Sequence, residues 1–395
     1  MKKPTLTGRN FGWLPAEQNT AVRHIAHIIR HDDGRGPLAA EFGGYSYREV
    51  LAGMDPALGE ESEDYRLPLE FRLELDQATD EQVLDAVARL INAYMDSLVF
   101  SQDESAEYDS SPYDWFLETN RLPRKADAGQ SALYYARNLL DTINGPRPLK
   151  SINDGTRSFK TLAQPFRFGP TELAGLKIFF TLAPQAANAG APTAHGIGNC
   201  VACHLAPQFT DFAFHNTGAA QEDYDTLHGP GAFGRLKVPG LAERRMDYDA
   251  WLPPTPKHPR ARGPFLDIPA ADKPGHTDLG LWNVFANPEH AGAQAALLEL
   301  LRDEVHVTGD EALLPLTLGR FKTPGLRGLA FSDPYLHTGR KMTLEDVIEF
   351  YRRMSKLARA GAVRNAAPEL SGIQLSAEDV APLAAFLRSL NEDYE

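Results

Sequence analysis

The stretch of this chain with the clearest chemistry is Cys200-Val201-Ala202-Cys203-His204, which has the C-x-x-C-H spacing of a haem c attachment site. In such a site each thiol adds across one vinyl group of the porphyrin, and the histidine that follows binds the iron as its proximal ligand. The two cysteines are the only ones in the 395 residues. The motif therefore predicts one covalent haem c, held by Cys200, Cys203 and His204.

Two other chemistries also use closely spaced cysteines. A structural zinc site needs four ligands, usually with a second cysteine or histidine pair, and here only histidines could complete it. A thioredoxin-like dithiol is expected within a βαβ pattern, which the flanking sequence lacks. Haem attachment is therefore the favoured interpretation, with zinc binding and dithiol chemistry as the alternatives.

The composition is typical of a globular protein with two or three domains, at 395 residues, 43% hydrophobic and 24% charged. No apolar run reaches the length of a membrane span. The net charge of −13 argues against nucleic acid and anionic membrane surfaces as partners. We therefore expect neither a nucleic-acid partner nor a membrane-spanning segment.

The elements that must position the motif are predicted to be helices, because apolar residues recur at helical spacing and strand-type alternation is scarce. A helix before the motif and a helix closing the chain are what a cytochrome c-like domain needs to enclose a porphyrin. Residues 219–318 are expected to be a largely irregular insert. The predicted fold is mainly α and cytochrome c-like, with long irregular insertions. The expected helices span about 13–31, 79–98, 131–143, 170–180, 291–305, 343–354 and 376–390.

Three segments at and after the motif resemble, in order, the C-terminal haem domain of bacterial di-haem cytochrome c peroxidases and MauG-type enzymes. They are C-H-L-A-P-Q-F-T-D with F-H-N-T-G (203–218), F-K-T-P-G-L-R (321–327), and P-Y-L-H-T-G with T-L-E-D (334–346). The resemblance covers residues 170–395, and S-P-Y-D at 111–114 is weakly similar to the family's interdomain segment. It implies a haem domain at 166–395, with an insert at about 219–318, after a helical region at 1–165 that resembles the rest of a first haem domain.

The resemblance also implies a second axial ligand in the helix after the P-Y-x-H-x-G motif, methionine in the peroxidases and tyrosine in MauG-like members. The matching residue is Tyr351. A phenolate oxygen favours ferric iron, whereas a thioether sulfur favours ferrous iron. Met342 and Met354 are the competing ligands, and Tyr351 as an aromatic residue packed in the core is the structural alternative.

Further site residues are implied only by the family. Backbone oxygens at Ser332 and Pro334 match the positions that help hold a calcium ion between the two haems. His215 and His337 lie inside family motifs, which places them near the haem or its propionates.

Two short segments near the N-terminus resemble parts of the family's peroxide site. Trp13 matches the tryptophan between the haems, and Glu41 matches the distal acid that moves a proton between the peroxide oxygens. The alternatives are a core tryptophan and a solvated loop carboxylate.

Family members have two C-x-x-C-H motifs, and this chain has one. Haem c is attached after export, yet residues 1–5 are not followed by the apolar region of a signal peptide. We expect a longer natural protein with a second haem, and a mono-haem relative that has lost the peroxide site is the alternative.

Together these features predict a periplasmic haem c oxidoreductase of the cytochrome c peroxidase/MauG type. It would use hydrogen peroxide as oxidant, exchange electrons with a protein donor or protein substrate, and form a homodimer. The alternative function is that of a non-enzymatic electron-transfer cytochrome c.

Overall fold

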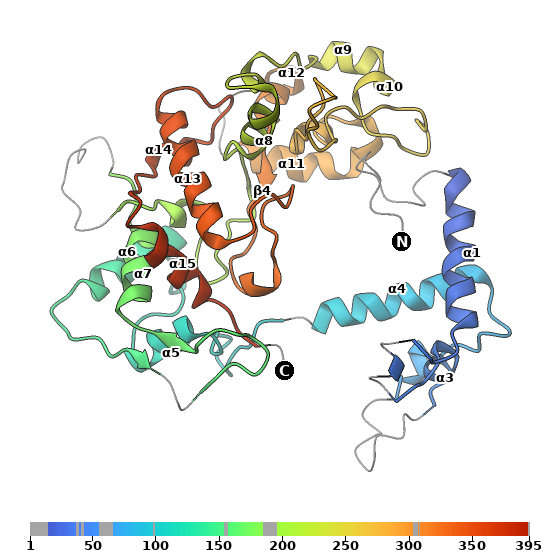
Figure 1. Cartoon of the computed structure of the whole chain (residues 1–395), viewed down its shortest axis with the longest axis horizontal. Helices are drawn as coiled ribbons and strands as arrows, with labels where there is room; N and C mark the ends of the chain where they lie inside the picture. Colours follow the sequence, from blue (N-terminus) through green and yellow to red (C-terminus); the bar gives the residue numbers. More distant parts are fainter. Residues whose placement is uncertain are drawn as a thin grey trace. The chain divides into compact units, whose positions relative to one another are not determined.

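The computed structural model describes residues 15–36, 39–40, 43–54, 66–97, 99–153, 157–184, 196–302, 307 and 309–393. These residues are mainly helical, which confirms the predicted fold class (Figure 1). The chain divides into two compact units: Met1–Val99 with Pro254–Ala261, and Phe100–Pro253 with Arg262–Glu395. None of the described helices is both long and apolar enough to cross a lipid bilayer. The predicted domain division at residue 165 stays a prediction.

The first unit is built around two helices that pack against each other, α1 and α4. α4 begins at a capping box, in which the Gln82 N–H donates to the Thr79 hydroxyl and the Thr79 N–H donates to the Gln82 side chain. Ala26 and Val83 are fully buried in its small core. The elements are α1 (Pro15–His31), α3 (Tyr47–Leu51), η2 (Leu69–Phe71) and α4 (Asp80–Ser97).

The second unit contains the C-x-x-C-H motif. Its main hydrophobic core lies between helices that precede the motif in the sequence and helices that follow it. We call this cluster the motif core. α7 and α15 lie side by side in it (Figure 1). Its helices are α5 (Pro112–Thr119), α6 (Ala132–Ile143), α7 (Pro170–Phe180), α13 (Leu344–Arg359) and α15 (Val380–Arg388), with the short helices η9 (Leu329–Phe331) and α14 (Pro368–Gly372) nearby.

Close approach of α7 and α15 depends on a glycine. A β-carbon at Gly175 would lie 1.9 Å from the Pro382 carbonyl oxygen, so the helices can meet at this distance only without a side chain there. Aromatic rings fill the space around the contact. They come from Tyr113, Phe179, Phe180, Phe209 and Phe386, with neighbouring ring centroids 5.2–6.4 Å apart.

Residues 219–318 have a hydrophobic core of their own, which we call the insert core. The predicted helix near residues 291–305 is present as α11 (Gln294–Arg302), and further short helices, separated by irregular stretches, gather around the fully buried Trp282. Most of them are too short to show a clear helical period, and the prolines between them hide the pattern further. They are α8 (Ala219–His228), η5 (Phe233–Arg235), α9 (Leu241–Met246), α10 (Tyr248–Trp251), η6 (Leu281–Asn283), η7 (Pro288–Ala293), α11 (Gln294–Arg302), α12 (Asp310–Leu313) and η8 (Leu314–Thr317).

Two small antiparallel ribbons complete the described part of the chain. β1 (Ile152–Asn153) pairs with β2 (Arg167–Phe168), and β3 (Phe214–His215) pairs with β4 (Phe321–Lys322). The second ribbon joins the F-H-N-T-G segment to the F-K-T-P-G-L-R segment across the insert. It therefore brings two of the family-like motifs together.

A buried ion pair ties the upstream S-P-Y-D segment to the same region. Arg327 donates from both terminal nitrogens to the carboxylate of Asp114, each at 2.9 Å, and both side chains are at most 3% exposed. Asp114 also accepts from the Ser111 hydroxyl at the start of α5. Such bidentate geometry compensates the buried charges. Because Arg327 also donates to the Pro207 carbonyl, residues 111–114 are linked to the segment that follows the C-x-x-C-H motif.

Helix ends differ from the predicted ones in α11, α13 and α15, and α11 begins at Gln294 and not near residue 291. α13 continues to Arg359, beyond the predicted end near residue 354. α15 begins at Val380 and not at residue 376, because the Ser376 N–H and hydroxyl donate to the Asp379 carboxylate and form a turn there.

Candidate haem-attachment site

The C-x-x-C-H motif forms one tight turn, the 3-10 helix η4 (Cys200–Ala202). The N–H groups of Cys203 and His204 both donate to the Cys200 carbonyl, at 3.2 and 2.8 Å. Neither cysteine forms a disulfide, and both are partly buried. The structure thus presents two thiols and an imidazole from a single turn, as covalent haem attachment requires.

Asn199 holds this turn in place. It adopts a left-handed backbone conformation with φ of 50° and is 7% exposed. Its side-chain oxygen accepts from the Ala183 N–H, and its amide nitrogen donates to the Glu369 carbonyl, both at 2.9 Å. An asparagine suits this position, since it tolerates φ > 0 and can bond to the backbone on both sides.

The His204 ring is held as a neutral ligand would be. Its Nδ1 lies 2.9 Å from the Phe209 carbonyl oxygen, which can only accept, so Nδ1 carries the hydrogen and Nε2 keeps its lone pair. Burial lowers the pKa of His204 by more than the Phe209 and Pro324 carbonyl groups raise it. Burial also raises the pKa of the Cys200 thiol to about 12, which keeps its S–H bond intact at neutral pH.

Tyr351 lies on α13, is partly buried, and faces the same region. Burial raises the pKa of its hydroxyl, and the charges that Cys203 and Cys200 can carry raise that pKa further. Tyr351 packs against the small hydrophobic cluster that contains Phe350 and Met354. Its role as the second axial ligand stays a prediction.

The two methionines that compete with Tyr351 are placed differently. Met354 is 2% exposed and packs against Gly218, where a β-carbon would lie 2.4 Å from the Met354 methyl carbon. Met342 is 64% exposed. One methionine is thus occupied in core packing and the other lies at the surface.

The remaining predicted site residues are less informative. The Ser332 hydroxyl donates to the Gly328 carbonyl, and Pro334 follows a cis peptide bond on an exposed loop. Their role in calcium binding stays a prediction. Trp13 and Glu41 lie outside the described residues.

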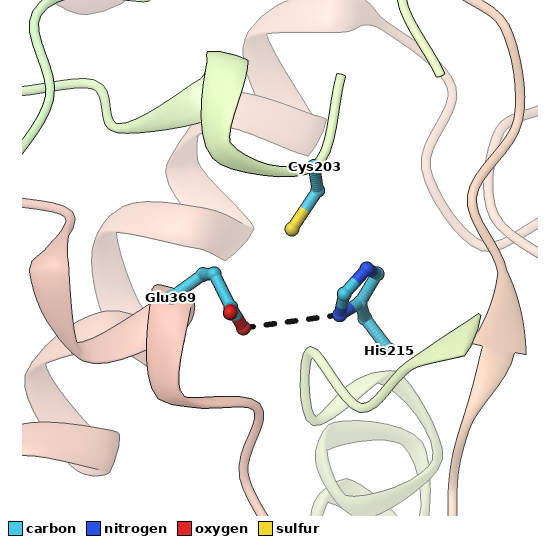
Figure 2. A group of neighbouring side chains, drawn as sticks. All are labelled: Cys203, His215 and Glu369. Carbon is cyan, nitrogen blue, oxygen red and sulfur yellow. Dashed lines mark ion pairs between the residues drawn. The ribbon is translucent and has the colours of Figure 1, made fainter. Parts of the chain in front are cut away.

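A side-chain cluster around Cys203 includes two carboxylates that sequence reasoning missed. His215 Nε2 lies 2.7 Å from Asp211 Oδ2, and His215 Nδ1 lies 3.8 Å from Glu369 Oε2. Cys203, His215 and Glu369 point toward one another (Figure 2). Asp211 could have been suspected from its i, i+4 spacing to His215, whereas Glu369 lies 154 residues downstream and only the fold brings it here.

The other predicted histidine, His337, stacks on Phe321 of β4 with a ring-centroid distance of 3.7 Å. This contact joins the P-Y-L-H-T-G segment to the F-K-T-P-G-L-R segment. All three family-like segments therefore meet in the second unit.

Comparison with curated proteins agrees with this geometry. A cytochrome-c peroxidase, IdrP2 of Denitromonas iodatirespirans, is 26% identical over 196 residues, which is 50% of this chain and 37% of the relative. IdrP2 of Pseudomonas sp. (strain SCT) is 26% identical over 253 residues, 64% of this chain and 50% of the relative. These matches support a cytochrome c peroxidase-like family.

A shorter match agrees with it, since the cytochrome-c peroxidase IdrP1 of Denitromonas iodatirespirans is 31% identical over 77 residues, 20% of this chain and 19% of the relative. The chain spans half or less of the length of each of these peroxidase relatives. No protein-family model matches it.

The residues present fit a covalent haem c. The turn supplies two thiols, and His204 supplies a neutral imidazole whose orientation is fixed by a main-chain carbonyl. The turn packs against the buried aromatic residues of the motif core. A dithiol alternative lacks a βαβ surrounding in the described residues, and the cytochrome c peroxidase relatives imply haem c. Cys200, Cys203 and His204 would hold the group.

Proposed function

We propose that this chain is a haem c-bearing, peroxidase-type oxidoreductase that uses hydrogen peroxide and receives electrons from a protein donor. The observation that supports it best is the turn at Cys200–Ala202, with His204 kept neutral and hydrogen-bonded to Phe209. Haem c, when bound, would supply one-electron chemistry at its iron. The proposal includes export to the periplasm, where haem c is attached.

The chain's own residues would prepare that chemistry. The Phe209 carbonyl holds the His204 ring in one tautomer and raises its basicity as a ligand. Tyr351 would supply a phenolic oxygen as the second axial ligand, and burial raises the pKa of that phenol. Tyr351 as ligand would favour oxidised iron over ferrous iron.

The first test is a haem count on the purified chain by the pyridine haemochrome assay, followed by spectra with and without hydrogen peroxide. We expect one haem per chain and an absorbance change on adding peroxide. One haem with no response to peroxide would instead favour an electron-transfer cytochrome for this chain.

The axial assignment is tested by Tyr351→Phe, which removes the phenolic oxygen and leaves the ring. We expect the ferric spectrum to change and the reduction potential to rise, because an anionic oxygen donor is lost. Tyr134→Phe, at a tyrosine that is 55% exposed, is the matched control and should change neither. An unchanged ferric spectrum in Tyr351→Phe would reject Tyr351 as a ligand.

A further inference from the structure

The side chains around Cys203 have the composition of a site for a thiophilic metal ion other than haem iron. A thiol, an imidazole and a carboxylate each offer one ligand atom here, and these atoms all lie within 4.8 Å of one another (Figure 2). A tetrahedral zinc ion, bound to sulfur at about 2.3 Å and to nitrogen at about 2.0 Å, separates its ligand atoms by roughly 3.5 Å. Side-chain rotations that close the cluster by about an ångström would therefore complete the site.

The hydrogen bonding of His215 prepares it to bind a metal through Nδ1. The Asp211 carboxylate is held beside His215, since its other oxygen accepts from the Ala213 N–H at 2.9 Å. A carboxylate can only accept, so His215 Nε2 carries the hydrogen that faces Asp211 at 2.7 Å. The Nδ1 lone pair then faces Glu369. A histidine oriented by a carboxylate on its far nitrogen is the usual outer-shell arrangement at protein zinc sites.

Glu369 supplies the second indication of a ligand. Its Oε2 atom is buried and accepts no hydrogen bond, although a buried carboxylate oxygen normally does. The same atom lies 3.8 Å from His215 Nδ1. A cation between the two would give Glu369 Oε2 the partner that it lacks. The backbone of Glu369 is fixed independently, since its carbonyl accepts from Asn199.

We propose that the haem-free chain binds a thiophilic divalent cation, represented by Zn²⁺, through Cys203 Sγ, His215 Nδ1 and Glu369 Oε2, and that this ion and covalent haem exclude each other. Three protein ligands leave a fourth position for water. On binding, the thiol loses its proton to solvent and a zinc–sulfur bond forms.

Exclusion follows from the chemistry of Cys203. During haem attachment its S–H bond breaks, the sulfur bonds to one vinyl carbon and the hydrogen bonds to the other, so the sulfur becomes a thioether. A thioether is a poor ligand for Zn²⁺, and a zinc-bound thiolate is not free to add to a vinyl group. The exclusion rests on the proposed haem attachment, whereas ion binding itself does not.

Zinc binding is measured by calorimetry on the full chain, produced without haem-attachment machinery and kept reduced. We expect Cys203→Ala and Glu369→Gln each to weaken binding at least tenfold. Cys200→Ala is the matched control, since Cys200 is outside the cluster, and it should bind zinc nearly as wild type does. If Cys200→Ala weakens binding as much as Cys203→Ala does, and Glu369→Gln has no effect, the C-x-x-C pair alone holds the ion and the proposal is wrong.

Cobalt gives a second measurement that does not depend on affinity. Co²⁺ in the site should show the charge-transfer absorption of one thiolate, and Cys203→Ala should remove it. Circular dichroism checks that the haem-free chain is helical, and an unfolded haem-free chain also overturns the proposal, because only the fold brings residues 203, 215 and 369 together.

The exclusion is tested by attaching haem with and without prior zinc. Zinc should lower the attachment yield of the wild-type chain severalfold and leave that of Glu369→Gln unchanged. The haem-bearing chain should bind no Co²⁺ at this site. Equal attachment with and without zinc would overturn the exclusion while leaving ion binding to be judged by calorimetry, and a chain that never accepts haem would instead contradict the proposed function.

Discussion

The second unit contains two hydrophobic cores that are built in different ways. The motif core consists of regular helices whose apolar faces interlock, and the aromatic rings around Phe386 occupy its centre. The insert core consists of short helices around Trp282, and a buried arginine helps to hold it. Arg244 donates to the Trp282 and Phe285 carbonyls at 2.6 and 2.5 Å and lies over the Trp282 ring.

This difference shows which kind of contact stabilises each of the two cores. Helices that bury a whole face gain most of their stability from apolar area, so their contact depends on shape, as at Gly175. Short helices leave many main-chain carbonyls without helical partners, and side chains such as Arg244 and Asn283 must satisfy them. Steric changes should therefore damage the motif core most, and polar changes should matter in both.

The largest expected effect is that of Gly175→Ala, which places a methyl group against the Pro382 carbonyl and forces α7 and α15 apart. We expect a loss of about 3 kcal/mol in the free energy of unfolding, at the upper end of overpacking costs. Urea unfolding followed by circular dichroism measures it. The insert offers the matched control: Gly292→Ala meets no atom within 4 Å and should change stability by less than about 0.5 kcal/mol. Equal effects at the two glycines would contradict the comparison.

The next prediction compares the losses of unfolding free energy when each core's buried arginine loses its contacts. Asp114→Asn removes the charge that faces Arg327 and should cost about 3 kcal/mol, because an unpaired buried charge remains. Arg244→Met leaves two carbonyls without donors and should cost about 2 kcal/mol. Urea unfolding of both variants checks the order. If Asp114→Asn loses less unfolding free energy than Arg244→Met, the insert core depends more on its buried arginine than the motif core does.

The smallest effect concerns buried carboxyls and pH. Burial raises the pKa of Glu392 from its usual 4.5 to about 7, and one of its oxygens is buried without a hydrogen bond. Folding thus favours the protonated form, so this contribution to stability is complete below pH 4.5 and is lost as the pH rises to 7. We expect Glu392→Gln to be more stable than wild type by about 1 kcal/mol at pH 8, after allowance for solvent screening, with no gain at pH 4.5.

Unfolding curves at several pH values measure this difference. The insert counterpart is Asp278, whose pKa burial raises from 3.8 to about 6. Asp278→Asn should show the same trend in the lower window, between pH 3.8 and 6. A gain for Glu392→Gln that does not vary with pH would mean that its carboxyl does not titrate there.

Much of the motif core was predictable, because long amphipathic helices leave a period in the sequence. α6 and α7 of the motif core, and α4 of the first unit, were all expected near their observed bounds. The other helices of the insert were missed for the converse reason. Its helices have as few as three or four residues, and a period of 3.6 cannot be seen over one turn.

The candidate site shows the same division. The haem prediction followed from local spacing in one turn of chain, and the structure forms that turn as a single 3-10 helix around Cys200–Ala202. The Asp114–Arg327 pair spans 213 residues, and Glu369 reaches Cys203 from a distant helix; neither contact has a local signature.

By itself, the sequence determined two properties: the haem-attachment spacing of Cys200, Cys203 and His204, and the mainly helical class of the fold. These depend on neighbours along the chain, through covalent reach and helical period. Only the tertiary structure decided that His204 is held through Phe209, that Met354 is committed to packing, and that Glu369 faces His215 beside Cys203. Those features arise from segments far apart in the chain, which are brought together by the burial of apolar surface that no single segment could achieve alone.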